Sequence, residues 1–286
     1  MRPLLTSTAV ALLLAVPSLA VAQEDTLTKI KRTSAITIGY TETSAPFSSV
    51  GAGGVPQGYS IDLCLRIADS VKKDLSLSQL DVKWAKVTAE NRIASVANGA
   101  VDIECGTTTK TLSRMAQVEF SLLTFLDGGS LLVTTASGIN KLTDLPGKRV
   151  AVIPTTTTER AMHNIIKRLS LQNVTLVSVK DHAEGMAAID AGRVDAYASD
   201  RTLLVGLGAA SKDRTKLRVL DDFISYEPYA FMIRRGDANF GLAVNRALTR
   251  LYRNAEVVPI YEKWFGPFPE GGSLIAALYV LNSIPE

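Results

Sequence analysis

Two ten-residue segments of this 286-residue chain match each other without gaps, one in each half of the sequence. Residues 94–103 read ASVANGAVDI and residues 187–196 read AAIDAGRVDA, which pairs Gly99 with Gly192 and also pairs the Val-Asp dipeptides that follow them. Each copy has the pattern of a helix that stops at a glycine and leads into a strand. Because any helix-to-strand turn can look like this, the evidence lies in the placement: the copies stand about 93 residues apart and predict two similar lobes.

Strand and helix patterns alternate around both copies. Stretches that alternate or are rich in β-branched residues predict strands, and apolar residues at helical spacing predict helices between them. The expected strands are 35–39, 82–87, 101–105, 149–153, 175–179 and 194–198, and the expected helices are 61–75, 90–98, 159–169 and 184–191. This order predicts an α/β fold with mostly parallel sheets flanked by helices and with sites at the carboxyl ends of the strands. Two such lobes would meet at a cleft, where small-molecule ligands usually bind.

The first 22 residues, MRPLLTSTAVALLLAVPSLAVA, have the three parts of a secretory signal peptide. Arg2 supplies the positive charge, residues 9–16 the apolar run, and residues 20–22 an A-x-A cleavage site. The apolar run is shorter than the roughly 20 residues that a membrane-spanning helix needs. No cysteine follows the cleavage site, which argues against a lipid anchor. We therefore expect residues 1–22 to be removed and the mature protein to be exported, to the periplasm in a cell with two membranes.

The composition is that of an ordinary globular protein, with 47% hydrophobic and 21% charged residues. It excludes collagen-like, coiled-coil and disordered chains. Lysine and arginine exceed aspartate and glutamate by only 31 to 28 and form no basic run. A nucleic-acid-binding chain would gather such residues on one face, so no nucleic-acid partner is expected.

Cys64 and Cys105 are the two cysteines of the chain. In an exported protein an even pair is interpreted first as a disulfide, and the alternative is two buried thiols that behave as small hydrophobic side chains. Neither cysteine stands at a metal-ligand spacing, and His163 and His182 fall on different expected elements, so no metal site is predicted. The sequence also lacks a nucleophile elbow, a phosphate-binding loop, a dinucleotide fingerprint and a zinc-protease motif, so we expect neither a cofactor nor catalysis.

Two polar loops directly follow expected strands. Residues 106–114, GTTTKTLSR, offer backbone N–H groups, hydroxyls and the guanidinium of Arg114, a set of donors suited to a carboxylate. Residues 155–159, TTTTE, begin a helix, and Thr156 with Glu159 fits a capping box. The start of that helix would direct partial positive charge at an anion. Capping alone is the plainer interpretation of either loop, but two such loops facing one cleft suit a small zwitterion or dianion.

Eight short motifs occur in order along nearly the whole mature chain. They are E-T-S-A-P-F-S (42–48), G-Y-S-x-D (58–62), E-N-R-I (90–93), N-G-A-V-D-I-E-C-G-T-T-T (98–109) with Arg114, D-L-P-G-K (144–148), V-K-D-H (179–182), A-G-R-V-D-A (191–196) and Y-E-K-W-F (261–265). In this combination the sequence resembles the type II periplasmic solute-binding proteins of amino-acid ABC transporters, and within that family the members that bind glutamate and aspartate.

The resemblance implies two α/β lobes that are joined by two crossover strands and close on a ligand by a hinge motion. Lobe 1 would comprise residues 23–127 and 225–286, and lobe 2 residues 128–224. It also implies the partners, which are a small-molecule amino acid and an inner-membrane ABC permease, and we expect the protein to be a monomer.

The resemblance further implies which residues would hold the α-carboxylate of the ligand. They come from both polar loops: Arg114, Thr107 and Thr109 from lobe 1, and Thr156 or Thr157 from lobe 2. Loss of binding in an Arg114→Ala variant is the direct expectation. The alternative for Arg114 is a solvated side chain with no ligand.

Asp200 matches the position that pairs with the α-ammonium group, and Arg92 and His182 match the positions that hold an acidic side chain. Two positions depart from the glutamate/aspartate pattern, because Thr41 stands where an arginine is found and Ala89 where a serine is found. Loss of one guanidinium removes a charge-assisted contact of roughly 1.5–3 kcal/mol. The amino-acid class is thus better specified than the acidic side chain.

Simpler structural roles exist for the same residues. Arg92 could form a surface ion pair with Glu90 or Glu104. His182 and Asp200 could each cap the helix that follows it. The placement of all these residues after strands in both halves favours a shared site over separate structural roles.

A rival function from another class also has to be considered. The periplasmic cyclohexadienyl dehydratases, which act on prephenate or arogenate, use the same scaffold. Such a site needs a general acid near a departing hydroxyl, and Glu42 or His182 could be offered for that role. We expect the binding function.

Overall fold

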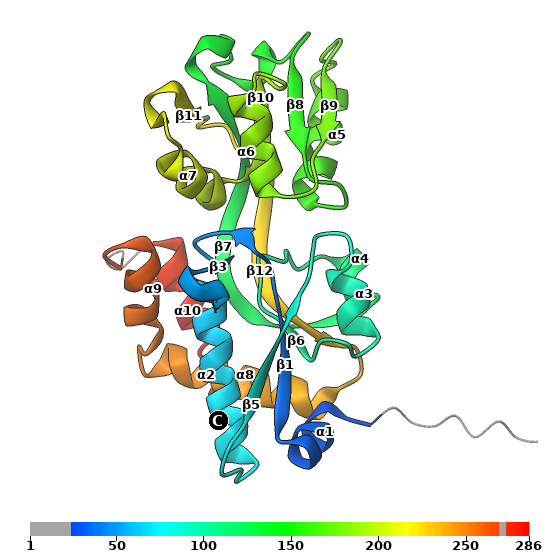
Figure 1. Ribbon diagram of the computed structural model, residues 1–286, viewed down its shortest axis with the longest axis vertical. Helices are drawn as coiled ribbons and strands as arrows, with labels where there is room; N and C mark the ends of the chain where they lie inside the picture. The colour runs from blue at the N-terminus through cyan, green and yellow to red at the C-terminus, as the bar shows by residue number, and fades with distance from the viewer. Residues whose placement is uncertain (1–23, 269–272, 286) are drawn as a thin grey trace, which may run out of the picture.

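The computed structural model describes residues 24–268 and 273–285. The predicted signal peptide, residues 1–22, falls outside the described residues. Within them the chain forms two lobes, one above the other in Figure 1, and two long strands run from one lobe into the other. These crossovers are β7 (Val118–Thr134) and β12 (Ser225–Arg234). The two-lobed α/β fold expected from the sequence is confirmed.

Lobe 1 is the lower lobe in Figure 1 and carries most of the helices. Its strands are β1 (Ala35–Tyr40), β5 (Asp81–Lys86) and β6 (Ile103–Glu104), with a small antiparallel sheet of β2 (Thr43–Ser44), β3 (Ser48–Val50) and β4 (Pro56–Gln57). Its helices are α1 (Thr26–Thr33), α2 (Tyr59–Asp74), α3 (Arg92–Ala97), α4 (Leu112–Met115), α8 (Ala238–Arg253), α9 (Val257–Phe265) and α10 (Leu274–Leu281).

Lobe 2 is the upper, smaller lobe. Its strands are β8 (Arg149–Val152), β9 (Thr175–Ser178), β10 (Ala196–Asp200) and β11 (Leu217–Val219), and its helices are α5 (Thr157–Arg168), α6 (His182–Asp190) and α7 (Arg201–Ala210). Every strand and helix expected from the sequence pattern has a counterpart within a few residues. The two crossovers were absent from that set and were implied only by the family resemblance.

The strands of both lobes join into one hydrogen-bonded path. In the described part of the chain the order is β5-β1-β6-β12-β7-β10-β8-β9. Pairing is parallel within each lobe, between β1 and its neighbours β5 and β6 and between β8 and its neighbours β9 and β10. The crossovers pair antiparallel with each other along their length, from Ser225 opposite Gly129 to Arg234 opposite Val118. The lobes are therefore linked by a two-stranded ribbon.

The two sequence repeats occupy equivalent places in the two lobes. The glycine that ends the helix of each copy has a left-handed backbone, with φ of 77° and 63°. Asp102, just before β6, accepts the amide of Thr37 in β1 at 2.7 Å. Asp195, just before β10, accepts the amide of Arg149 in β8 at 2.8 Å. The Val-Asp dipeptide of each copy thus ties a strand to its parallel neighbour.

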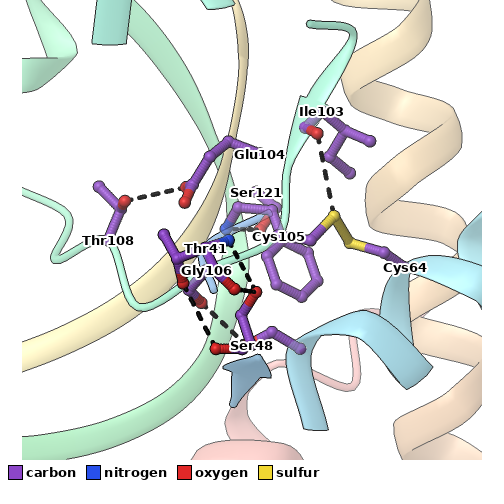
Figure 2. The surroundings of a disulfide bond; sticks show 11 residues. Thr41, Ser48, Cys64, Ile103, Glu104, Cys105, Gly106, Thr108 and Ser121 are labelled. Carbon is purple, nitrogen blue, oxygen red and sulfur yellow. Dashed lines mark hydrogen bonds between the residues drawn. A yellow bond between two sulfur atoms is a disulfide. The ribbon is translucent and has the colours of Figure 1, made fainter. Parts of the chain in front are cut away.

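Cys64 of α2 and Cys105, which follows β6, are joined by a disulfide (Figure 2). Both residues are fully buried. The bond holds α2 against the segment that leads two residues later to Thr107, the first predicted ligand residue of lobe 1. No helix among residues 24–268 and 273–285 is long and apolar enough to cross a membrane.

Candidate functional site

A cavity of about 240 Å³ lies between the lobes, at the carboxyl ends of their parallel strands. Seven of the eight ligand residues predicted from the sequence line it: Arg92, Thr107 and Thr109 from lobe 1, and Thr156, Thr157, His182 and Asp200 from lobe 2. Residues more than 100 positions apart thus converge on one volume. The lining also includes two charged residues at the edge of lobe 1, Glu42 and Lys86.

Arg114, the eighth residue, does not line the cavity but lies behind Thr109. Its Nη1 donates to the carbonyl of Thr109 at 2.8 Å, and its Nη2 donates across the lobes to the carbonyl of Thr155 at 3.3 Å. The side chain is buried, and burial, with repulsion from Arg92, lowers the pKa of Arg114 to about 10. It is still charged at neutral pH. The interpretation of Arg114 as a solvated side chain is wrong.

Arg92 is the first residue of α3 and is 6% exposed. Among the described residues its Nε has no hydrogen-bond partner, and it forms no ion pair with Glu90 or Glu104. The surface ion pair considered above is therefore wrong. Burial raises the pKa of the Glu104 carboxyl, while Arg92 nearby opposes that rise. A buried guanidinium with free donors faces the cavity, and such a group is costly unless an acceptor reaches it.

The threonine loop of lobe 2 begins α5 as expected. Thr156 is the N-cap: its hydroxyl accepts the amide of Glu159 at 3.1 Å and donates to the carbonyl of Ile153 at 2.7 Å. The carboxylate of Glu159 accepts the amide of Thr155 at 2.8 Å, one residue earlier than a capping box would place it. The first amides of α5 remain available to a ligand, as in any helix.

Asp200 ends β10 and occupies the N-cap position of α7, but its side chain makes no capping bond. The amide of Thr202 instead donates to Asp127 of β7 at 3.0 Å. Asp200 accepts the hydroxyl of Tyr229, which belongs to the other crossover. Burial raises the pKa of Asp200 well above its usual range, and the neighbouring Glu227 and Asp127 add to the rise. The capping role proposed for the Asp200 side chain is wrong, and its carboxylate is left for the cavity.

His182 is the first residue of α6, whose cap is Asp181, with the amide of Glu184 donating to that carboxylate at 2.9 Å. The capping role considered for His182 is therefore wrong. Its Nδ1 lies 2.6 Å from the hydroxyl of Tyr197. Burial lowers the pKa of His182 to about 4, so the imidazole is neutral near pH 7 in the empty cavity.

The two positions that depart from the glutamate/aspartate pattern lie on the lobe 1 side of the cavity. Thr41 donates its amide to the hydroxyl of Ser48 at 2.9 Å, and the carbonyl of Ala89 accepts the hydroxyl of Thr155 from lobe 2 at 3.0 Å. Lys86 pairs with Tyr40 in the β1–β5 register, next to Thr41, and its Nζ lies 2.6 Å from Glu42. An ammonium group thus stands near the place of the missing guanidinium.

Three polar residues of the crossovers were missed by the sequence analysis. Tyr229 and Glu227 bind residues of the cavity wall, and Glu227 is fully buried. Asp127 is half-buried and accepts the amide of Thr202, which precedes the wall residue Leu203. The signal that could have revealed the two acids is a carboxylate inside an otherwise apolar run, in TFLDGGSLLV and SYEPYAFMI. Such groups are rarely buried unless they are paired.

A cluster of at least three histidine, cysteine or acidic residues able to hold a metal ion is absent from the described part of the chain. The cavity instead presents the guanidinium of Arg92 on the lobe 1 side, with that of Arg114 behind Thr109, the carboxylate of Asp200 on the lobe 2 side, and amides and hydroxyls between them. This arrangement suits a small molecule that carries both a carboxylate and an ammonium group.

Comparison with known proteins agrees with this chemistry. Residues 36–267 match the model of the bacterial extracellular solute-binding proteins, family 3. The chain is 41% identical over 281 residues to the L-glutamate/L-aspartate-binding protein of Pseudomonas aeruginosa, covering 94% of this chain and 90% of that protein. It is 33% identical over 245 residues to the glutamate/aspartate import solute-binding protein of Salmonella typhimurium, covering 85% of this chain and 81% of that protein.

One similar solved structure bears on the rival function. The ancestral amino acid-binding protein AncCDT-1, described as a precursor of cyclohexadienyl dehydratase, superposes with a TM-score of 0.72 at 27% identity. The match covers 85% of this chain and 100% of that one.

Proposed function

The chain belongs to the bacterial extracellular solute-binding proteins of family 3, and we propose that it captures L-glutamate or L-aspartate between its lobes for an amino-acid ABC importer. One observation carries the proposal. Two buried side chains line the same cavity from opposite lobes: Arg92, whose Nε has no acceptor among the described residues, and Asp200, whose carboxylate has no cationic partner among them. An acidic amino acid would satisfy both at once.

We assign the α-amino and α-carboxyl groups of the ligand to the end of the cavity near Asp200 and Arg114. The ligand ammonium pairs with Asp200 and relieves the repulsion that this carboxylate receives from neighbouring acids. The α-carboxylate takes the donors of Arg114 in place of the Thr155 carbonyl, whose bond of 3.3 Å is the longer of the two that Arg114 makes. Backbone amides of Thr107, Thr109, Thr156 and Thr157 complete its shell.

The side-chain carboxylate of the ligand is assigned to Arg92 and His182. Arg92 contributes the charge, since His182 is neutral near pH 7 and would act as a hydrogen-bond donor. Lys86 adds a second positive charge near Thr41, which offsets part of the loss of an arginine there. A bound carboxylate would raise the pKa of His182 toward its ordinary value.

We assign residues 23–127 and 225–286 to lobe 1 and residues 128–224 to lobe 2, with opening and closure about the β7–β12 ribbon. Closure would bury the charges of the ligand, and unpaired charges are expensive there, which gives selectivity for α-amino acids. The proposed setting is the periplasm, after removal of residues 1–22. The protein would act as a monomer that hands its ligand to an inner-membrane permease.

Calorimetric titration of the refolded, ligand-free protein with each of the twenty amino acids tests the proposal. We expect micromolar or tighter binding of glutamate, aspartate or both. Glutamine is the matched control because it differs from glutamate only in the side-chain charge. Arg92→Gln should weaken glutamate binding far more than glutamine binding. No heat with any of the twenty would refute the proposed function.

The dehydratase alternative has one observation in its favour, the similarity to AncCDT-1. Neither proposed general acid fits the chemistry. His182 is a neutral imidazole above about pH 4 and lacks the imidazolium proton that a general acid would transfer, and Glu42 is half-exposed and paired with Lys86 at 2.6 Å. We propose that the protein is not an enzyme. Spectrophotometric detection of prephenate turnover would overturn this.

A further inference from the structure

Glu227 binds threonine hydroxyls from both lobes with a single oxygen atom. Its Oε2 accepts the hydroxyl of Thr109, in lobe 1, and the hydroxyl of Thr157, in lobe 2, the latter at 2.6 Å. Its Oε1 accepts the hydroxyl of Ser225 at 2.5 Å. The residue lies on the crossover β12 and is fully buried. Three hydroxyl donors thus satisfy this carboxylate without any ligand.

Two other charge-assisted bonds join the lobes beside the crossovers: the hydroxyl of Tyr229 donates to Asp200, and the amide of Thr202 donates to Asp127 at 3.0 Å. Unlike Glu227, neither of these carboxylates accepts hydroxyls from both lobes.

Two neutral or longer contacts also cross the cavity. Thr155 donates its hydroxyl to the carbonyl of Ala89 at 3.0 Å, a neutral pair at the exposed edge. Arg114 reaches the carbonyl of Thr155 only at 3.3 Å. A bond from a hydroxyl to a buried carboxylate is charge-assisted and about twice as strong as a neutral one.

Each threonine hydroxyl carries one proton. While Thr109 and Thr157 donate to Glu227, neither can also donate to the carboxylate of a ligand. The proposed α-carboxylate must then find its donors elsewhere, in Arg114 and the amides at the start of α5. Although both residues line the cavity, their hydroxyls connect the two lobes through Glu227.

We infer that Glu227 is a positioning residue for closure: its carboxylate joins Thr109 of lobe 1 to Thr157 of lobe 2 and so stabilises the closed arrangement before any ligand arrives. The effect of Glu227 on ligand affinity rests on the proposed function, whereas its effect on closure does not. Apparent ligand affinity scales with the fraction of molecules in the binding-competent state. If that state is the closed one, a larger closed fraction in the ligand-free protein gives a higher apparent affinity.

The test is small-angle X-ray scattering of the ligand-free protein, which measures closure and needs no ligand. Thr157→Val keeps the shape of the side chain and removes the lobe 2 hydroxyl. We expect the ratio of closed to open molecules to fall about tenfold, which raises the radius of gyration. Glu227→Gln keeps an oxygen acceptor but loses the charge, so its shift should be smaller and in the same direction.

Ser225→Ala is the matched control, because it removes a hydroxyl donor of the same carboxylate that lies on the same strand as Glu227. It also removes the acceptor of the Gly129 amide, a bond within the β7–β12 ribbon and not across the cavity. It should leave the radius of gyration of the ligand-free protein unchanged. Thermal melting of each variant shows that it is folded. A ligand-free Thr157→Val protein as compact as the wild type would overturn the inference, as would an equal expansion in Ser225→Ala. Failure of glutamate to bind would instead count against the proposed function and leave this measurement intact.

Discussion

The two lobes differ both in how they are packed and in what they bring to the cavity. Lobe 1 has a core rich in aromatic rings, among them Phe47, Tyr59 and Phe125, and is stapled by the disulfide. Lobe 2 has two smaller, mainly aliphatic clusters. Lobe 1 contributes the guanidinium of Arg92 to the cavity and holds that of Arg114 behind Thr109, whereas lobe 2 contributes the carboxylate of Asp200 and a neutral imidazole.

This difference assigns separate tasks to the lobes. The well-packed lobe 1 carries the cations, whose positions matter most for binding an anion. The smaller lobe 2 brings Asp200, the carboxylate that we assign to the ligand ammonium. In the proposed binding mode a ligand without an ammonium group would lose its ion pair with Asp200, and an amino acid would pair with charged groups of both lobes.

Removal of Arg114 is expected to have the largest effect on this division of tasks. Arg114→Ala deletes two charge-assisted contacts to the α-carboxylate, which corresponds to at least about 1,000-fold weaker binding, or loss of measurable binding. Calorimetry with glutamate is the measurement. A variant that binds within tenfold of the wild type would show that lobe 1 does not dominate recognition.

The disulfide should stabilise the protein through lobe 1. Its cysteines are 41 residues apart, and the entropy of closing a loop of that size corresponds to about 4 kcal/mol. Cys64→Ala combined with Cys105→Ala should lower the free energy of unfolding by that order, measured by chemical denaturation. A second, earlier transition in the variant would assign the loss to lobe 1, and no change in stability would contradict the expectation.

Asp200→Asn should separate binding from stability in lobe 2. Without the carboxylate the ligand ammonium loses its ion pair, and we expect about 100-fold weaker binding by calorimetry. The ligand-free variant should unfold at a higher temperature, because burial and neighbouring acids disfavour the charged form of this carboxyl. Weaker binding with a lower melting temperature would mean that Asp200 has a structural role instead.

His182 should give the smallest effect, visible in the pH dependence of stability. Its pKa is about 4 in the folded protein against about 6.5 in an unfolded chain, so below pH 6.5 the unfolded state binds a proton that the folded state does not. Stability is therefore lost as the pH falls from 6.5 toward 4, by about 2 kcal/mol at pH 5. The ligand-free His182→Gln variant should lack this part of the loss in denaturation experiments at pH 7.5 and 5. If the free energy of unfolding fell by the same amount between pH 7.5 and pH 5 in the variant and the wild type, His182 would not cause the loss.

Much of the fold could be predicted because its signals are local. The helix, glycine and Val-Asp pattern around Asp102 and Asp195 predicted equivalent units, and these form the same strand-to-strand bonds. The crossovers could not be found in the same way. Their apolar runs are interrupted by Asp127 and Glu227, and only the packing of two lobes shows why an acid belongs there.

Most of the ligand residues predicted from the sequence line the cavity, but the hydrogen bonds between them and the crossovers could not be predicted. Polar residues after strands converge at one edge of a parallel sheet, which is why Arg92, His182 and Asp200 meet. The bond from Tyr229 to Asp200 and the two threonine bonds of Glu227 join residues that are 29 to 118 positions apart. They depend on how far the lobes are closed, which no local pattern encodes.

The pairing of β7 with β12 also limits how the molecule can move. A single crossover strand would allow lobe 2 to rotate in any direction relative to lobe 1. Two strands paired from Ser225 to Arg234 form a ribbon that bends across its face more easily than it twists or slides. In the proposed opening and closure, this ribbon would restrict lobe 2 to nearly one path, and the donors of the two lobes would return to the same positions.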